Sequence, residues 1–272
     1  ALRVETEAGE VAVPHHSRYY AEDRECLDDR IETVYGKHEK REGENARIVR
    51  KTDGSVITVA TQTVEQSLDI DADLLITDLC PMDVLLQRIG RLHRHERGDD
   101  RPVGYRDARC VVLTPENRSL KRTIDPDSGK GFPGPGLGSV YADLRIIEAT
   151  WRALNKRTGQ NAISIPRDNR TLVEEATHPK VLKSIKHSDE RWRAHTRYLR
   201  KQKREEVLGA KNVQIDRDQW FTADGNQFPD ALPKTRLGEE DIVVKLPQEL
   251  MTPFGNAVEE LTLSPYLFDS DD

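Results

Sequence analysis

"ADLLITDLCPMDVLLQRIGRLHR" occupies residues 72–94 and decides the fold. Its first part, residues 72–79, is a short apolar run of the kind that forms a buried parallel strand. Pro81 then opens a second part with the pattern of an amphipathic helix. The apolar residues that recur there at the spacing of one helix face are Val84, Leu85, Ile89 and Leu92. The stretch therefore predicts a strand followed by a helix.

Two further runs that are rich in β-branched and apolar residues lie on either side of this unit. They are "GSVITVAT" at residues 54–61 and "ARCVVLTP" at residues 108–115, and both predict buried parallel strands. Residues 21–36, "AEDRECLDDRIETVYG", predict a helix that stops at Gly36. Because strands alternate with helices, the fold class is expected to be α/β, with an open parallel sheet. Ligands of such sheets bind at the carboxyl ends of the strands.

The second half of the chain is predicted to be mostly helical. Residues 125–138 contain five glycines and three prolines, which favours a flexible loop or linker at a domain boundary. The elements expected after it are helices over 139–154, 172–185 and 189–208 and a short strand over 242–246. The domains expected are a lobe over 1–120, a loop and linker helix over 121–160, and a smaller C-terminal domain over 161–272.

The composition limits the class of protein. The chain has 272 residues and a net charge of −6, which argues against a surface that is basic throughout but leaves room for a local basic groove. Its three cysteines form no CxxC pair, so we expect buried thiols, a reducing cytoplasmic location and no zinc site. No apolar run approaches the length of a membrane span, and no membrane partner is expected.

Three arginines at the end of the opening stretch form the first candidate site. Arg88, Arg91 and Arg94 recur three residues apart and would share one face of a helix or helical turn. Gly90 removes a side chain between them, so that a ligand could approach closely. Guanidinium groups suit phosphate oxygens and stay charged at any working pH. The alternative is a solvated helix, although no acid for i,i+4 pairing lies between Asp83 and Glu96.

A polar segment ahead of the strand forms the second candidate site. In "VATQTVEQSLDIDADLLITD", residues 59–78, Thr61 and Thr63 offer hydroxyls to a phosphate. Asp69 could accept a hydrogen bond from a ribose hydroxyl or from a water on Mg²⁺. The alternative is an ordinary loop between a strand and a helix, with a helix cap.

Taken together, the two segments resemble motifs V and VI of the superfamily 2 helicases. The resemblance implies a RecA-like parallel sheet flanked by helices, the second lobe of a helicase, followed by a linker helix and a smaller, mostly helical C-terminal domain. It also implies that Gln87, Arg88 and Asp69 bind the nucleotide ATP. Arg91 and Arg94 would be catalytic residues of the arginine-finger type, which stabilise charge on the transferred phosphoryl group.

Other segments narrow the resemblance to Cas3, the helicase-nuclease of type I CRISPR interference. They are "HHSRYYAEDR" at residues 15–24, Ser67 within "VEQSLDID", and "TRLGEEDIVV" at residues 235–244. By this resemblance single-stranded DNA is a partner, as are an HD nuclease and the crRNA-guided Cascade complex, with a phage inhibitor protein as a further candidate. The residues implied to contact DNA are His16, Ser17, Arg18, Thr61, Thr63 and Gln66.

Several motifs that a Cas3-like enzyme needs do not occur in this sequence. It contains no G-x-x-x-x-G-K-[ST] loop, no DExH box and no HD nuclease box. We therefore expect only the C-terminal part of such an enzyme, inactive without an N-terminal HD domain and first RecA-like lobe. ATP and Mg²⁺ would act in the whole enzyme, and this chain would supply no metal ligand beyond a water-mediated Asp69. Two alternatives stay open: a partner- or inhibitor-binding module, and the C-terminal half of another DNA or RNA helicase.

A basic run, "RWRAHTRYLRKQKR" at residues 191–204, is the last candidate. Trp192, His195 and Leu199 are expected to pack inward. The side chains expected to face outward are Arg193, Arg197, Arg200 and Arg204. The run is either a solvated amphipathic helix, or a wall for single-stranded DNA or another protein.

Overall fold

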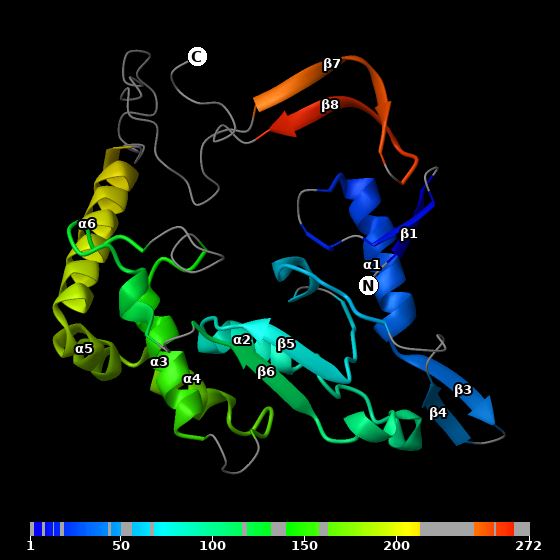
Figure 1. Ribbon diagram of the computed structural model, residues 1–272, viewed down its shortest axis with the longest axis horizontal. Helices are drawn as coiled ribbons and strands as arrows, with labels where there is room; N and C mark the ends of the chain where they lie inside the picture. Colours follow the sequence, from blue (N-terminus) through cyan, green and yellow to red (C-terminus); the bar gives the residue numbers. More distant parts are fainter. Residues whose placement is uncertain are drawn as a thin grey trace, which may run out of the picture. The chain divides into compact units, whose positions relative to one another are not determined.

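The computed structural model describes most of the chain (Figure 1). The described residues are 3–6, 9–12, 14–16, 19–42, 45–49, 56–65, 68–115, 119–131, 140–157, 163–212, 242–252 and 254–263. Ser17, Arg18, Gln66, Ser67 and residues 235–241 of the "TRLGEEDIVV" segment lie outside them.

The strand–helix–strand unit predicted from residues 72–115 is present. Strands β5 (Leu74–Asp78) and β6 (Arg109–Leu113) pair in parallel, with Leu74 opposite Arg109 and Asp78 opposite Leu113. Helix α2 (Met82–Ile89) connects them, and the side chains it buries are Met82, Leu85 and Leu86. The α/β class is thereby confirmed. The two strands present one face to solvent: Ile76 is 59% exposed and Leu113 is 51% exposed.

The strand predicted over residues 54–61 is wrong for the part that the structure describes, residues 56–61. Only Ala60 forms a β-bridge, a parallel one with His15, and Ile57 and Val59 are 66% and 62% exposed. Backbone hydrogen bonds join His15 N to Val59 O and Thr61 N to His15 O, both at 2.9 Å. A strand needs a neighbouring strand along its length, and one bridging residue does not supply it.

Helix α1 (Ala21–Tyr35) confirms the helix predicted over 21–36, with Gly36 at its C-cap. It buries Leu27 and Ile31, which pack with Leu68 into a hydrophobic cluster. The partly buried side chains around that cluster are Tyr19, Tyr35, Ile70 and Phe254. Two antiparallel hairpins flank α1 in sequence: β1 (Arg3–Thr6) with β2 (Gly9–Ala12), and β3 (His38–Glu42) with β4 (Asn45–Val49).

The described residues between 140 and 212 are mostly helical, as predicted. The helices are α3 (Leu144–Asn155), α4 (Asn169–Thr177), α5 (Pro179–Ser188) and α6 (Glu190–Asn212). The helix predicted over 172–185 is two helices, because a proline at position 179 cannot continue the hydrogen bonding of a helix and so begins the next one.

Short 3₁₀ helices occur in the first half of the chain. They are η1 (Gln62–Glu65), η2 (Gly98–Asp100), η3 (Val103–Tyr105) and η4 (Leu120–Thr123).

Helix α6 buries one face and exposes a basic one. Trp192 and His195 are 2% and 0% exposed, whereas the Arg197 side chain is 73% exposed. The His195 ring joins α6 to two other segments: its Nδ1 lies 2.8 Å from Gly129 O, and its Nε2 accepts a hydrogen bond from Leu144 N at 3.1 Å. Gly129 has φ +73°, and a Cβ there would lie 2.4 Å from Ala194 O, so the position requires glycine.

Strands β7 (Ile242–Met251) and β8 (Ala257–Leu263) form a two-stranded sheet, and β7 is longer than the strand predicted over 242–246. The chain divides into two compact units, which alternate along the sequence. One unit consists of Ala1–Arg118, Ile146–His178 and Glu249–Val258, and the other of Ser119–Arg145, Pro179–Gln248 and Glu259–Asp272. The domain ranges inferred from the sequence stay a prediction. Among the described residues, no helix is both long and apolar enough to span a membrane.

Candidate functional site

Helix α2 ends too early for Arg88, Arg91 and Arg94 to share one of its faces. Helix α2 ends at Ile89, Gly90 caps it, and the next residues form a turn, so that only Arg88 lies on the helix. The chain turns away because Leu92 bridges to Ala72, at the entrance to β5. Two backbone hydrogen bonds secure this bridge, from Ala72 N to Arg91 O at 2.9 Å and from His93 N to Ala72 O at 3.0 Å.

Arg88 binds protein groups on both sides of its guanidinium. Its Nε donates to Glu65 Oε1 at 2.6 Å, and its Nη1 donates to Thr77 Oγ1 at 2.6 Å. Glu65 belongs to η1 and Thr77 to β5, so Arg88 joins the polar segment to the sheet. Gln87, one residue earlier on α2, is exposed.

The Arg91 side chain is partly buried, and only part of its guanidinium group is hydrogen-bonded. Its Nη2 donates to Glu65 O at 3.1 Å, but its buried Nε has no hydrogen-bond partner among the residues that the structure describes. Burial, and after it the positive charge of Arg94, lower the pKa of Arg91 from its ordinary value, against a weaker opposing effect of Asp69. The Arg91 guanidinium is therefore only partly matched by the groups around it in the described residues.

Arg94 is the most exposed of the three arginines and pairs with the polar segment. Its Nε lies 2.8 Å from Asp69 Oδ1, and the two side chains are 40% and 49% exposed. His95 Nε2 lies 3.2 Å from the same oxygen. The acids absent from the arginine segment itself are thus supplied by earlier parts of the chain, Glu65 and Asp69.

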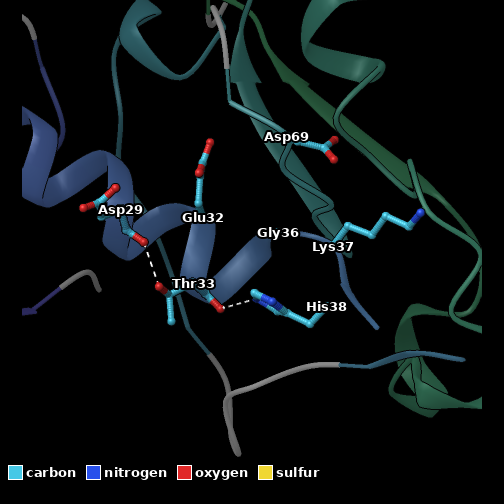
Figure 2. Close-up of a pocket in the computed structure, with 7 residues that line it drawn as sticks. All are labelled: Asp29, Glu32, Thr33, Gly36, Lys37, His38 and Asp69. Carbon is cyan, nitrogen blue, oxygen red and sulfur yellow. Dashed lines mark hydrogen bonds between the residues drawn. The ribbon is translucent and has the colours of Figure 1, made fainter. Parts of the chain in front are cut away.

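Asp69 also borders a hollow of about 470 Å³ (Figure 2). The other residues that line it come from the end of α1 and the segment after it: Asp29, Glu32, Thr33, Gly36, Lys37 and His38. Thr33 donates to Asp29 O at 2.8 Å, and His38 Nε2 lies 2.8 Å from Thr33 O. With three carboxylates in its lining, this hollow does not suit an anion, so a phosphate held by Arg91 would have to lie elsewhere.

A buried ion cluster follows the arginine segment, and sequence reasoning missed it. Asp71 is 2% exposed and binds both Arg97 and Arg101, the latter at 3.0 Å. Arg101 also binds Asp73 at 2.9 Å, and Arg97 donates to Gly36 O at 3.0 Å. The alternation of Asp71 and Asp73 before β5 was a visible signal, but the sequence does not show which arginines they meet.

The threonines of the polar segment lie on either side of the start of η1. Thr61 is exposed, whereas Thr63 hydrogen-bonds through its hydroxyl to Nδ1 of the fully buried His15. His15 Nε2 lies 2.6 Å from Asp28 Oδ1 on α1. A carboxylate can only accept, so Nε2 carries the proton, and in the neutral ring Nδ1 accepts from Thr63. Sequence reasoning missed His15 as well.

The predicted DNA contacts are only partly described. His16 stacks on Tyr19, with ring centroids 4.5 Å apart and planes at 9°. The loop with His16 is linked through its neighbour His15 to Thr63, and Glu65 of the same 3₁₀ helix binds Arg88 and Arg91. The structure therefore brings the predicted DNA and nucleotide residues onto one connected set of segments. Ser17, Arg18 and Gln66 stay predictions.

Cys80 is buried and Cys110 is partly buried, and both are thiols of low reactivity. Burial raises the pKa of both Cys80 and Cys110 to about 11, which keeps the thiols protonated at neutral pH. The described part of the chain has no group of three or more His, Cys, Asp or Glu side chains that could hold a metal ion.

Comparison with known proteins shows which family the chain is similar to. A family model described as "CRISPR-associated nuclease/helicase Cas3, C-terminal" matches residues 1–97. The CRISPR-associated endonuclease/helicase Cas3 of Thermus thermophilus is 37% identical over 160 residues, which are 59% of this chain and 14% of that protein. The Cas3 of Escherichia coli is 41% identical over 147 residues, 53% of this chain and 13% of that protein. The chain thus spans about one seventh of these relatives.

A solved structure is similar to this chain over most of its length. The crystal structure of a CRISPR-associated protein matches with a TM-score of 0.57 and 28% identity, over 93% of this chain and 27% of that one. Its match extends the likeness well beyond residues 1–97, into the helical second half. The chain is therefore similar to the C-terminal region of Cas3 proteins, and its α/β fold is consistent with the RecA-like type.

Proposed function

We propose that this chain is the C-terminal part of an ATP-dependent single-stranded-DNA translocase or helicase of the Cas3 type. Its lobe supplies Arg91 and Arg94 to the phosphates of an ATP that is bound by another part of the complete protein. An HD nuclease in the complete protein degrades the translocated strand, and a crRNA-guided Cascade complex recruits it. A phage inhibitor protein is a further partner in this proposal.

The state of Arg91 carries the proposal. Its Nε is buried without an acceptor among the described residues, and Arg94 adds repulsion that lowers its pKa. A buried donor without a partner costs free energy, and so does a cation beside a cation. A phosphate would supply the acceptor and relieve the repulsion. This arrangement favours an anion that arrives from outside the chain.

The other residues have distinct roles in the proposal. Arg91 and Arg94 stabilise the negative charge that builds up on the transferred phosphoryl group. Gln87, exposed on α2, contacts the nucleotide, and Arg88 acts through Glu65 by holding η1 against the sheet. Asp69 pairs with Arg94 and reaches the ribose once ATP draws that arginine away.

Mg²⁺ belongs to the proposal only as part of the complete protein. The described residues hold no cluster of ligands for a metal, and Asp69 is engaged by Arg94 and His95. No step of the proposal therefore runs through a metal ligand of this chain.

The DNA side of the proposal rests on the loop with His16 and on the segment with Thr61 and Thr63. Both would contact the backbone of a single strand, together with Ser17, Arg18 and Gln66. Because Glu65 binds both Arg88 and Arg91, movement of the arginines on ATP binding would be transmitted to this segment.

The test is Arg91→Ala in the complete protein that contains this chain. DNA-stimulated ATP hydrolysis should fall by roughly 10³-fold or more, as for other arginine-finger residues. Single-stranded-DNA affinity should change by no more than about threefold, which is below 1 kcal/mol. Arg109→Ala, an exposed arginine on β6, is the matched control and should retain activity.

Two results would contradict the proposal. One is an Arg91→Ala protein that hydrolyses ATP at the normal rate. The other is DNA-stimulated ATP hydrolysis by the 272-residue chain alone, because the proposal places the ATP-binding loop elsewhere.

A second candidate function, a partner-binding module, is favoured by helix α6. Arg197, Arg200 and Arg204 lie on its exposed side, while Trp192 and His195 are buried. Charge reversal of the three arginines should weaken binding of the crRNA-guided complex and leave ATP hydrolysis unchanged. Equal binding by the reversed and original proteins would exclude this role for α6.

A further inference from the structure

The turn between β7 and β8 contacts a loop and helix from the opposite end of the sequence. Thr252, at the start of this turn, hydrogen-bonds to Asp23, 229 residues earlier. Both belong to the same compact unit, and Figure 1 shows the turn near the first turn of α1. The helix begins directly after the loop with His16, which the proposed function assigns to DNA.

Asp23 is the first point of contact. It is 2% exposed, and its Oδ1 accepts from Thr252 Oγ1 at 2.9 Å and from Asn256 Nδ2 at 2.6 Å. A buried carboxylate is stable only with such donors. The N-cap of α1, Tyr20, has no side-chain capping bond, so the turn supplies a tether where the helix has no cap of its own.

Aromatic rings form the second point of contact. Phe254 packs edge-on against Tyr19, with centroids 5.6 Å apart and planes at 81°, and Tyr19 is stacked on His16. Phe254 also packs against the cluster that contains Leu27 and Leu68. It therefore joins the loop to the same core that holds the segment ahead of β5.

The turn has its own internal bonds, which make it a firm support. The Thr252 hydroxyl accepts from Phe254 N and from Asn256 N, both at 3.2 Å. Thr252 N donates to Asn256 O at 2.8 Å, and Gly255, with φ +86°, closes the turn with a bond to Thr252 O at 3.0 Å.

We propose that Thr252, Phe254 and Asn256 of this turn position the DNA-contacting loop: Phe254 fixes Tyr19 and the stacked His16, while Thr252 and Asn256 fix the start of α1. The inference rests on the proposed function, because it concerns the same loop. It adds that residues of the far C-terminal hairpin set the DNA affinity of the lobe without touching DNA themselves.

The test uses Phe254→Ala and Thr252→Val in the complete protein. The single-stranded-DNA concentration for half-maximal ATP hydrolysis should rise about tenfold in each, corresponding to about 1.4 kcal/mol. The maximal rate and the KM for ATP should stay within about twofold, because the arginines are untouched. Hydrogen exchange of the peptide over residues 14–24 should become faster, while the peptide over 74–89 keeps its protection.

Conservative variants and a surface control separate positioning from general damage. Thr252→Ser keeps the hydroxyl and should restore normal DNA dependence, and Phe254→Leu should restore it in part. Met251→Ala, at a side chain 63% exposed in the same hairpin, should change nothing.

The outcomes distinguish the inference from the proposed function. Normal DNA dependence and normal exchange in Phe254→Ala would overturn the inference, even if Arg91→Ala abolishes ATP hydrolysis. Faster exchange over 14–24 in a protein that binds no DNA would support the contact but overturn the proposed function. The inference would also be overturned if the Phe254→Ala protein unfolds throughout the chain while the Thr252→Val protein has normal DNA dependence.

Discussion

Two groups of arginines lie close together in the sequence, yet their surroundings are opposite. Arg97 and Arg101 are 3% and 6% exposed, and both bind the buried carboxylate of Asp71. Arg91 has a buried nitrogen without an acceptor in the described part of the chain, and Arg94 pairs with Asp69 at the surface.

The difference supports the proposal that Arg97 and Arg101 hold the fold, whereas Arg91 and Arg94 bind a ligand. Buried charges persist in a protein only when they are paired and hydrogen-bonded, and Arg97 and Arg101 meet that condition within the chain. Among the described residues Arg91 Nε has no acceptor, and in the proposed function a phosphate supplies one. The inner cluster also fixes the chain just after the arginine segment, because Arg97 binds Gly36 O and Arg101 binds His95 O.

Asp71→Ala should give the largest effect on stability. It leaves two buried guanidinium groups without their shared carboxylate, which typically costs about 3–5 kcal/mol. Native-state hydrogen exchange of β5 measures the loss as a lower free energy of opening. Asp107→Ala, at an exposed bend, should change it by no more than about 0.5 kcal/mol. Similar values for the two variants would show that the inner cluster does not hold the fold.

Acid should weaken the same cluster. Burial alone would raise the pKa of Asp71, but hydrogen bonds from Arg97 and then Arg101 outweigh it and lower the pKa below the ordinary 3.8. A carboxyl whose pKa is lower in the folded state stabilises the fold above its unfolded pKa, and this contribution is lost as the pH falls through the folded pKa. The melting temperature should therefore fall below about pH 4. The fall should be shallower in Asp71→Ala, and equal slopes would contradict this assignment.

The sequence predicts the fold where local pattern decides it. Residues 72–79 and 108–115 became β5 and β6 because each pairs with the other along its length. Residues 54–61 have the same β-branched composition, but over 56–61 they form only one bridge. Strand formation depends on a partner far away in sequence, and composition does not report it.

The contacts within the candidate site are not visible in the sequence. The three-residue spacing identified Arg88, Arg91 and Arg94 together, yet they do not share a helical face, because the Leu92–Ala72 bridge ends the helix. The sequence also does not show that Glu65 binds Arg88 while Arg91 keeps an unmatched nitrogen. Such pairing is set by tertiary packing.

His195 is a buried but neutral side chain, and both of its ring nitrogens have hydrogen-bond partners. Burial lowers its pKa, so the ring is neutral, with Nδ1 donating to Gly129 O and Nε2 accepting from Leu144 N. His195→Phe fills the space but leaves both backbone groups unmatched, at a cost of about 1–3 kcal/mol. Hydrogen exchange over residues 194–199 measures this cost as a lower free energy of opening. His187→Phe, at an exposed position of α5, is the control, and a comparable loss there would show that the ring bonds contribute nothing.

Arg91→Gln should give the smallest effect on stability. The change removes a cation whose burial and whose neighbour Arg94 both oppose its charge, and it gives up one hydrogen bond, to Glu65 O. These contributions nearly offset one another, so the opening free energy of β5 should change by less than about 1 kcal/mol. ATP hydrolysis by the complete protein should nevertheless be lost, because glutamine cannot stabilise a phosphoryl charge as a guanidinium does. A loss of stability as large as that of Asp71→Ala would place Arg91 among the arginines that hold the fold. The proposed distinction between ligand-binding and fold-stabilising arginines would then be wrong.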